Sequence, residues 1–309
     1  MNRLYEKALV CFSVASLLVF SQLPCSAKET VKLLTVGNSF AINATQYLPD
    51  LVKSFPDCEL LLGAANIGGA PLDKHYKLAI ESETDGNIKP YRYRKAGSKE
   101  KSRKVNLKEI LAAEKWDVIT IQQYSAYSFK REKFVPYFKN LHDYIKKQVP
   151  QARIMVHQTW AYRADDARFR KQEFKQADMY RLLTENYRFF AKKSQCAILP
   201  SGAAFDLCRK KQQPAFSFPD PDFDYADPVK GSLPKQEGSL NVGWRWSKGK
   251  FSLDAHHANE RGCYLAACVW FEKLFGKDVR QTDFVPDVLQ KADAKFLQQI
   301  AHETVASFE

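Results

Sequence analysis

A serine near one end of the chain and an aspartate and a histidine near the other are the side chains best suited to nucleophilic chemistry. Ser39 follows Gly37 and Asn38, and Asp254 precedes His257 by three residues on what we expect to be a single loop. A serine hydroxyl is a poor nucleophile until a base removes its proton, and that base needs a carboxylate to orient its imidazole. We therefore predict a catalytic triad with Ser39 as nucleophile, His257 as base and Asp254 as acid.

The residues before Ser39 predict the element that positions it. The stretch 31–36 is mostly apolar and rich in β-branched residues, and it ends at Gly37, which indicates a buried strand. In open α/β sheets, ligands bind at the carboxyl ends of the strands. Ser39 is therefore expected at a ligand-binding edge, although a serine after Gly-Asn can also be a turn residue or the cap of a helix.

Ester hydrolysis passes through a tetrahedral anion, which fixed N–H groups stabilise. The backbone amide of Ser39 is one candidate donor. A second is the amide of Gly69, or else that of Gly68, because a residue without a side chain lets the main chain approach a substrate closely. The alternative is that the glycine pair forms a plain turn.

Four segments resemble, in order, the spaced blocks of the SGNH (GDSL-like) hydrolase superfamily, in its bacterial branch with G-N-S in place of G-D-S. They are G-N-S-F at 37–40, I-G-G-A-P-L-D-K-H at 67–75, W-D-V-I-T-I-Q-Q-Y-S at 116–125 and D-A-H-H-A-N-E-R-G at 254–262. The resemblance implies a Ser-His-Asp esterase on an α/β fold, a three-layer α/β/α sandwich with a five-stranded, mainly parallel, flavodoxin-like sheet. It also implies His257 as the base, because His256 lacks the three-residue spacing from Asp254.

The resemblance further implies a third oxyanion donor, normally an asparagine side chain in a Gly-x-Asn block after the third strand. This chain departs from that pattern, because Gln122 and Gln123 stand there. Side chains alternate along a strand, so only one of the two faces the site, and we favour Gln122 with Gln123 as the alternate. The candidate substrate contacts are Asn38, His75, Ser125, Trp160, Trp244 and Trp246.

Other sites built from the same residues are less well supported. Adjacent histidines on a loop seldom bind one ion, so we expect no metal at His256 and His257, and no cofactor. Ala41 stands where the G-x-S-x-G elbow of an α/β-hydrolase has its last glycine, which disfavours that fold. Asp254 could instead cap the helix expected from Ala258 onward.

The first 27 residues have the composition of a secretory signal peptide. Arg3 and Lys7 form a basic head, residues 8–20 are apolar, and C-S-A at 25–27 is a cleavage motif. We therefore expect a secreted or periplasmic protein without a stable membrane span after cleavage. A lipoprotein anchored at Cys25 is the alternative, which the preceding proline disfavours.

The formal net charge of +12 is spread along the chain. Its lysines and arginines are not interleaved with aromatic residues, so no nucleic-acid partner is predicted. A basic surface either keeps the protein soluble or suits an acidic partner such as an acidic glycan.

The cysteines beyond the signal segment favour neither a metal site nor a redox motif. They are odd in number and none is in a C-x-x-C pattern. Cys263 and Cys268 fall in an apolar helical stretch, where buried thiols are expected. Disulfide pairing stays open among Cys58, Cys196, Cys208, Cys263 and Cys268.

Residues 28–309 are expected to form one domain, because apolar runs alternate with helical stretches, a pattern typical of a parallel sheet with helices on both faces. Strands are predicted at 33–36, 58–64, 117–121, 153–157 and 196–199, and helices at 44–54, 132–148, 171–193, 258–275 and 288–307.

Two segments interrupt the alternation. Residues 85–104 are basic and polar and are expected to be exposed. Residues 212–250 are rich in proline and aromatic residues, and we expect an ordered loop that borders the site. Its aromatic rings either stack on sugar rings or pack the loop against itself.

These observations predict a secreted serine esterase that removes acetyl or other short acyl groups from a carbohydrate. The alternatives are a lipase or lysophospholipase of the same superfamily, which needs an apolar channel, and a secreted glycan-binding protein without catalytic activity. The acyl group, the glycan and the oligomeric state stay open.

Overall fold

The computed structural model describes residues 28–308 apart from 96–97, 99–100 and 171–172. The predicted signal peptide, with Cys25, lies outside the described residues. Within the described part of the chain, no helix is long and apolar enough to span a membrane.

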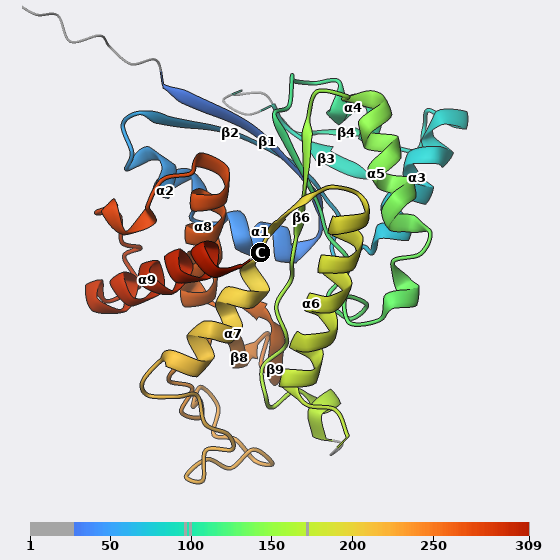
Figure 1. The fold of residues 1–309 in the computed structure, drawn as a ribbon. Coiled ribbons are helices and arrows are strands. Elements are labelled where there is room, and N and C mark those ends of the chain that lie inside the picture. The colour runs from blue at the N-terminus through green and yellow to red at the C-terminus, as the bar shows by residue number, and fades with distance from the viewer. Residues whose placement is uncertain (1–27, 96–97, 99–100, 171–172, 309) are drawn as a thin grey trace, which may run out of the picture.

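Five strands form the central sheet, in the order β2-β1-β5-β6-β7 (Figure 1). All four neighbouring pairs are parallel, so the predicted α/β fold is confirmed, with a sheet that is parallel throughout. This strand order is that of flavodoxin-like folds. The strands are β1 (Glu29–Gly37), β2 (Cys58–Asn66), β5 (Val118–Ile121), β6 (Arg153–His157) and β7 (Ala197–Leu199).

Helices cover both faces of the sheet, which gives the predicted three layers (Figure 1). The inner strands β1, β5 and β6 are largely buried on both faces, and Leu33 and Leu34 of β1 are fully buried as a result. One layer contains α1 (Ser39–Thr45), α2 (Leu48–Lys53), α7 (Ser201–Lys211), α8 (Glu260–Phe275) and α9 (Lys291–Ser307). The other contains α3 (Leu72–Thr84), α4 (Leu107–Leu111), α5 (Tyr137–Gln148) and α6 (Gln176–Lys193).

Several predicted boundaries are wrong for local reasons. The helix predicted at 44–54 is two helices, because Pro49 occupies the first turn of α2 and starts a new helix there. The polar segment 85–104 is not wholly exposed: it contains β3 (Tyr91–Tyr93) and β4 (Arg103–Val105), which pair antiparallel. Tyr91 and Tyr93 are buried, so this segment adds to the core.

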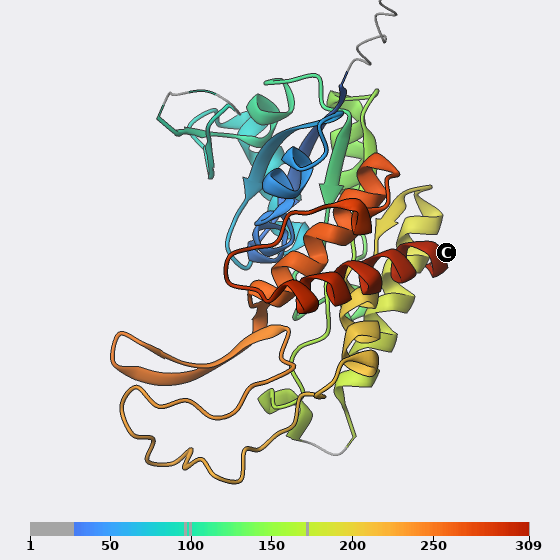
Figure 2. The ribbon, with the colours of Figure 1, turned by 90° about the vertical axis from the view of Figure 1, so that its left-hand side faces the viewer.

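The segment 212–258, which we call the arm, projects from the body of the molecule (Figure 2). It consists of an irregular loop, 212–240, and a hairpin of β8 (Asn241–Ser247) and β9 (Lys250–Ala258). Asp254 and His257 therefore lie on a strand, and the prediction of a loop there is wrong. The hairpin was missed because its glycines and aromatics look like loop residues in sequence.

The aromatic residues of the arm pack against one another. Trp244 stacks on Phe251 with ring centroids 4.7 Å apart, and Tyr225 contacts Trp244 at 5.2 Å. Trp246 donates its indole N–H to Ser232 O at 2.8 Å. This local core orders an otherwise irregular loop, so Trp244 and Trp246 have a structural role, while their contact with a substrate stays a prediction.

All five cysteines of the described residues have free thiols. Cys263 and Cys268 are buried in α8, as predicted. Burial raises the pKa of the Cys263 thiol to about 12, so it is a small apolar side chain of the core.

Gly262 lets the start of α8 approach the end of the arm loop. A side chain there would collide with Leu240 O and the Phe205 ring. We expect Gly262→Ala to lower the free energy of unfolding by about 2 kcal/mol, because overpacking outweighs the better helix propensity of alanine. Urea unfolding measures the change. Gly86→Ala is the control, because nothing lies within 4 Å of its added methyl group; equal stability of the two variants would contradict the argument.

Candidate active site

The three predicted triad residues form a continuous chain of hydrogen bonds. His257 Nδ1 lies 2.9 Å from Asp254 Oδ2, and His257 Nε2 lies 2.8 Å from Ser39 Oγ. Since the carboxylate can only accept, Nδ1 carries the proton and Nε2 accepts the hydroxyl proton of Ser39. The imidazole is thus in the tautomer that a general base requires.

An irregularity in β9 brings Asp254 and His257 to the same side. In a regular strand, residues three apart point to opposite faces. Here Asn241 pairs with Ala258 and Gly243 pairs with Asp254, so four steps along β9 match two along β8. The two extra residues lie between acid and base and turn both side chains toward Ser39. Bulges of this kind re-aim side chains beside active sites.

The Asp254 carboxylate is held in its ionised form. Burial raises its pKa, but hydrogen bonds from the His257 ring and from the backbone N–H groups of His257 and His256 outweigh that effect and leave the pKa below its ordinary value. Arg245 of β8 also donates to Asp254 Oδ2, at 3.1 Å. An ionised carboxylate at this position is able to stabilise an imidazolium at His257.

Ser39 is the first residue of α1 and directly follows Asn38, the N-cap of that helix. The first N–H groups of a helix have no partner within it, so the Ser39 amide is available to an oxyanion. Gly69 has a φ of 63°, which favours glycine, and lies with Gly68 on an exposed turn after β2. The structure thus keeps both backbone donors as candidates.

Asn38 positions this turn instead of contacting a substrate. Its buried Oδ1 accepts the Phe40 N–H at 3.0 Å and caps α1. The same oxygen accepts from Gln122 Nε2 at 2.9 Å, and Asn38 Nδ2 donates to Ala70 O at 3.1 Å. One side chain therefore ties the nucleophile to the glycine turn and to the end of β5, and the prediction of a substrate contact is corrected.

The glutamines do not complete the oxyanion hole as predicted, because both side chains are buried and hold neighbouring segments. Gln122 Oε1 accepts from His157 Nδ1 at 3.0 Å. Gln123 Oε1 accepts the Leu72 N–H at 3.2 Å, and its Nε2 donates to Lys133 O at 2.6 Å. A side chain on Gly37 would lie 2.7 Å from Gln122 Oε1, so Gly37 makes room for this contact.

His75 and His157 are buried behind the turn and stay neutral. Burial lowers the pKa of His75 to about 4 and that of His157 to about 3. His75 Nε2 donates to Gly37 O at 3.0 Å, and its Nδ1 accepts from Tyr91 O–H at 2.9 Å. His75 therefore supports the strand end before Ser39, and the suggestion that it touches a substrate is corrected.

Two further predicted contacts are also buried. Ser125 Oγ lies 2.8 Å from the Tyr162 hydroxyl. Trp160 stacks on Phe40, with centroids 4.4 Å apart, and donates its indole N–H to His256 O at 2.8 Å. Both residues pack the wall of the site without reaching its surface.

Sequence reasoning missed four polar residues around the triad. His256 Nε2 lies 2.9 Å from Asp166 Oδ2, and Arg168 Nη1 lies 3.0 Å from Asp166 Oδ1. Asp166 and Arg168 come from the segment A-D-D-A-R, which carries no motif. Arg245 lies on β8, the partner strand of β9. Their contact with β9, the strand that carries Asp254 and His257, depends on tertiary structure alone.

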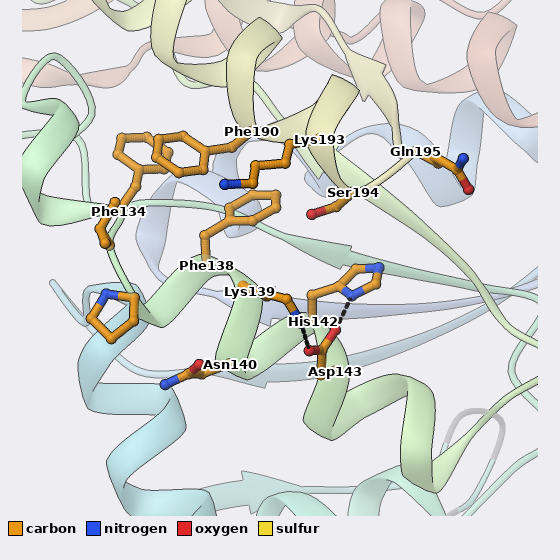
Figure 3. Close-up of a pocket in the computed structure, with 12 residues that line it drawn as sticks. Phe134, Phe138, Lys139, Asn140, His142, Asp143, Phe190, Lys193, Ser194 and Gln195 are labelled. Atoms are coloured by element: carbon orange, nitrogen blue, oxygen red, sulfur yellow. Dashed lines mark hydrogen bonds and ion pairs between the residues drawn. The ribbon is translucent and has the colours of Figure 1, made fainter.

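A cavity of about 370 Å³ lies between α5 and the C-terminal end of α6 (Figure 3). Phe134, Phe138 and Phe190 form its apolar side, and Lys193 reaches toward it. It shares no residue with the triad and is a feature of the helical layer.

One group among the described residues has the spacing of a metal site. Ligand atoms of Glu272, Asp278 and His302 lie within 4.8 Å of one another, on α8, α9 and the turn between them. His302 donates to Glu272 at 3.0 Å, and Arg280 pairs with Asp278 at 2.7 Å. These protein partners already satisfy the group, which includes no triad residue.

A family model described as "Domain of unknown function (DUF4886)" matches residues 32–214 and 245–304. The chain belongs to the DUF4886 family. The match omits 215–244, most of the irregular part of the arm, and includes all three triad residues. No curated protein matches the chain significantly.

Solved structures extend this comparison. The crystal structure of a DUF4886 protein from Bacteroides uniformis is 25% identical, with a TM-score of 0.71 over 90% of this chain and 96% of that one. A putative SGNH hydrolase from Slackia heliotrinireducens is 19% identical, with a TM-score of 0.46 over 79% and 98%. An acetylxylan esterase from Geobacillus stearothermophilus is 14% identical, with a TM-score of 0.43 over 82% and 98%.

The lowered pKa of Asp254 makes a prediction for stability. Its favourable contribution is present above the ordinary aspartate pKa of about 4 and is lost as the pH falls through the lower folded value. We expect Asp254→Asn to destabilise the DUF4886 fold most at about pH 7 and by a smaller amount at about pH 3, where the unfolded chain binds the proton and the folded carboxylate is still ionised. Urea unfolding at both pH values tests this. The exposed Asp287→Asn is the control, expected within about 0.5 kcal/mol throughout; a difference for Asp254→Asn that is as large at about pH 3 as at about pH 7 would contradict the argument.

Asn38 makes a second prediction. We expect Asn38→Ala to lower the free energy of unfolding by about 2 kcal/mol, because it removes a helix cap and leaves buried polar groups of Gln122 and Ala70 unpaired. Denaturant titration measures the loss. Asn87→Ala, at an exposed turn, is the control, and an equally small effect of both would show that Asn38 does not hold the turn.

Proposed function

We propose that this DUF4886 protein is a serine esterase of Ser-His-Asp type. The observation that supports it is the alignment of Ser39 Oγ, the His257 ring and the Asp254 carboxylate in one chain of hydrogen bonds at the carboxyl edge of β1. An aligned nucleophile, base and acid is what acyl transfer requires. A purely glycan-binding protein has no need of that alignment.

The mechanism follows from the geometry. His257 Nε2 takes the Ser39 proton as Oγ attacks the ester carbonyl, and Asp254 stabilises the imidazolium. The amides of Ser39 and Gly69 stabilise the oxyanion. His257 then gives its proton to the departing alcohol, which leaves an acyl group on Ser39. Water, deprotonated by the same His257, attacks that acyl group and releases the acid.

The surroundings of the triad favour a short acyl group on a polar alcohol. The His257 side chain is 39% exposed, so the base is accessible from solvent. The triad contacts the apolar ring of Phe40, whose centroid lies 6.0 Å from that of His257, and the charged Arg245. A lipase or lysophospholipase needs a long apolar channel at this position, which these contacts do not favour.

We further propose that the substrate is an acetyl ester of a carbohydrate and that the protein acts outside the cytoplasm. The segment 1–27, with its basic head and apolar core, supports export. The resemblance of the four motif blocks to SGNH hydrolases supports the esterase class.

Hydrolysis of p-nitrophenyl acetate tests the esterase directly. We expect turnover that falls about 10⁴-fold or more in both Ser39→Ala and His257→Ala, because each removes a member of the proton-transfer chain. A fluorophosphonate probe, which reacts only with an activated serine, should label the unmodified protein and not Ser39→Ala. The exposed Ser217→Ala is the control and should keep full turnover. An inert protein, or folded variants as active as the unmodified protein, would refute the proposal.

A further inference from the structure

Two ion pairs contact β9, and each exposes its positively charged partner to solvent. In each pair the carboxylate is covered and the guanidinium is exposed: Asp166 is 7% exposed against 41% for Arg168, and Asp254 is 10% exposed against 50% for Arg245. Both guanidinium groups therefore carry exposed positive charge next to residues of β9, Arg168 at His256 and Arg245 at Asp254.

Arg168 is fixed in place. Its Nη1 donates to both oxygens of Asp166, at 3.0 and 3.1 Å, and its guanidinium lies over the Tyr162 ring at 4.9 Å. Tyr162 is buried and its hydroxyl is 2.8 Å from Ser125 Oγ. The side chain is therefore held in one orientation, which reduces the entropy that a bound ligand must overcome.

Asp166 remains ionised as the anchor of this arrangement. Burial raises its pKa, but hydrogen bonds from His256 and from the Arg168 backbone, with the charge of Arg168, more than offset this and lower the pKa. His256 also donates its backbone N–H toward Asp254 Oδ1, at 3.3 Å. His256 thus connects Arg168 to the triad, one residue from the base.

The free edge of Arg168 has the shape of a carboxylate site. Within the described part of the chain, its Nε and Nη2 groups have no hydrogen-bond partner, while Nη1 carries all the contacts. Nε–H and Nη2–H form the side of a guanidinium that binds a carboxylate with two parallel bonds. This protein uses that same edge elsewhere: Arg163 binds Asp165 and Arg261 binds Asp293 through Nε and Nη2, each bond 2.7 Å long.

Where the start of α8 meets the end of α1, the exposed charge is negative. There the exposed carboxylate of Glu260, the first residue of α8, accepts from Tyr47 and, at 2.6 Å, from Gln46. The exposed charges around the triad residues therefore differ in sign: they are positive at Arg168 and Arg245 and negative at Glu260. An anionic group of a substrate would be oriented by this difference.

We propose that Arg168, which contacts His256 next to the base, binds a carboxylate on the sugar part of the substrate. The glycan is then a uronate-bearing one, and the ester to be cleaved lies within reach of Ser39 when the carboxylate is paired with Arg168. This inference rests on the proposed esterase function and adds the class of glycan to it.

The experiment compares kcat/KM on an O-acetylated oligogalacturonide and on a neutral acetylated xylo-oligosaccharide. We expect the unmodified protein to have a higher kcat/KM on the acidic substrate. Arg168→Gln should lower the acidic-to-neutral ratio of kcat/KM about tenfold, because a charge-assisted pair is removed. Arg168→Lys, which keeps the charge without the two-pronged edge, should fall between the two. Added salt should reduce the preference of the unmodified protein.

Arg181→Gln is the matched control, because Arg181 is an exposed arginine on α6 paired with Glu185 and outside the site. Its acidic-to-neutral ratio should equal that of the unmodified protein. Equal kcat/KM on both glycans, or a ratio that Arg168→Gln does not change, would overturn the inference and leave the esterase intact. Absence of both p-nitrophenyl acetate turnover and fluorophosphonate labelling would overturn the esterase itself, and this inference with it.

Discussion

The site depends on one buried amide side chain. Asn38 joins the first turn of α1, the glycine turn after β2 and the end of β5, because its oxygen accepts two hydrogen bonds and its nitrogen donates a third. Buried polar groups are stable only when they are paired, so these three segments have a single arrangement that satisfies the amide. The orientation of Ser39 and the position of the Gly69 turn follow from that arrangement.

Sequence reasoning predicted the elements whose signals are local. The strands were found because each is a continuous apolar run, and Ser39 was placed at a strand end because Gly37 follows such a run. The partners of Gln122 were not predictable, because alternation along a strand tells which face a side chain is on and not what it meets there. His157 lies 35 residues further along the chain and forms its hydrogen bond with Gln122 only in the folded sheet.

The same limit explains the arm. Its prolines and aromatic residues indicate an ordered loop, but the offset between β8 and β9 depends on cross-strand pairing, which the sequence of β9 alone does not contain. That offset gives Asp254 and His257 a common direction. Arg245 is on the facing strand of the hairpin, so the charge next to the acid is set by the same pairing that positions the base.

The two halves of the triad are also far apart in the order of synthesis. Ser39 and His257 are separated by 218 positions, with four of the five strands of the central sheet, β2, β5, β6 and β7, between them. A growing chain therefore carries the serine through nearly all of its translation without the histidine that would activate it. The three side chains therefore come together only when the arm has been made and β9 has packed against α1.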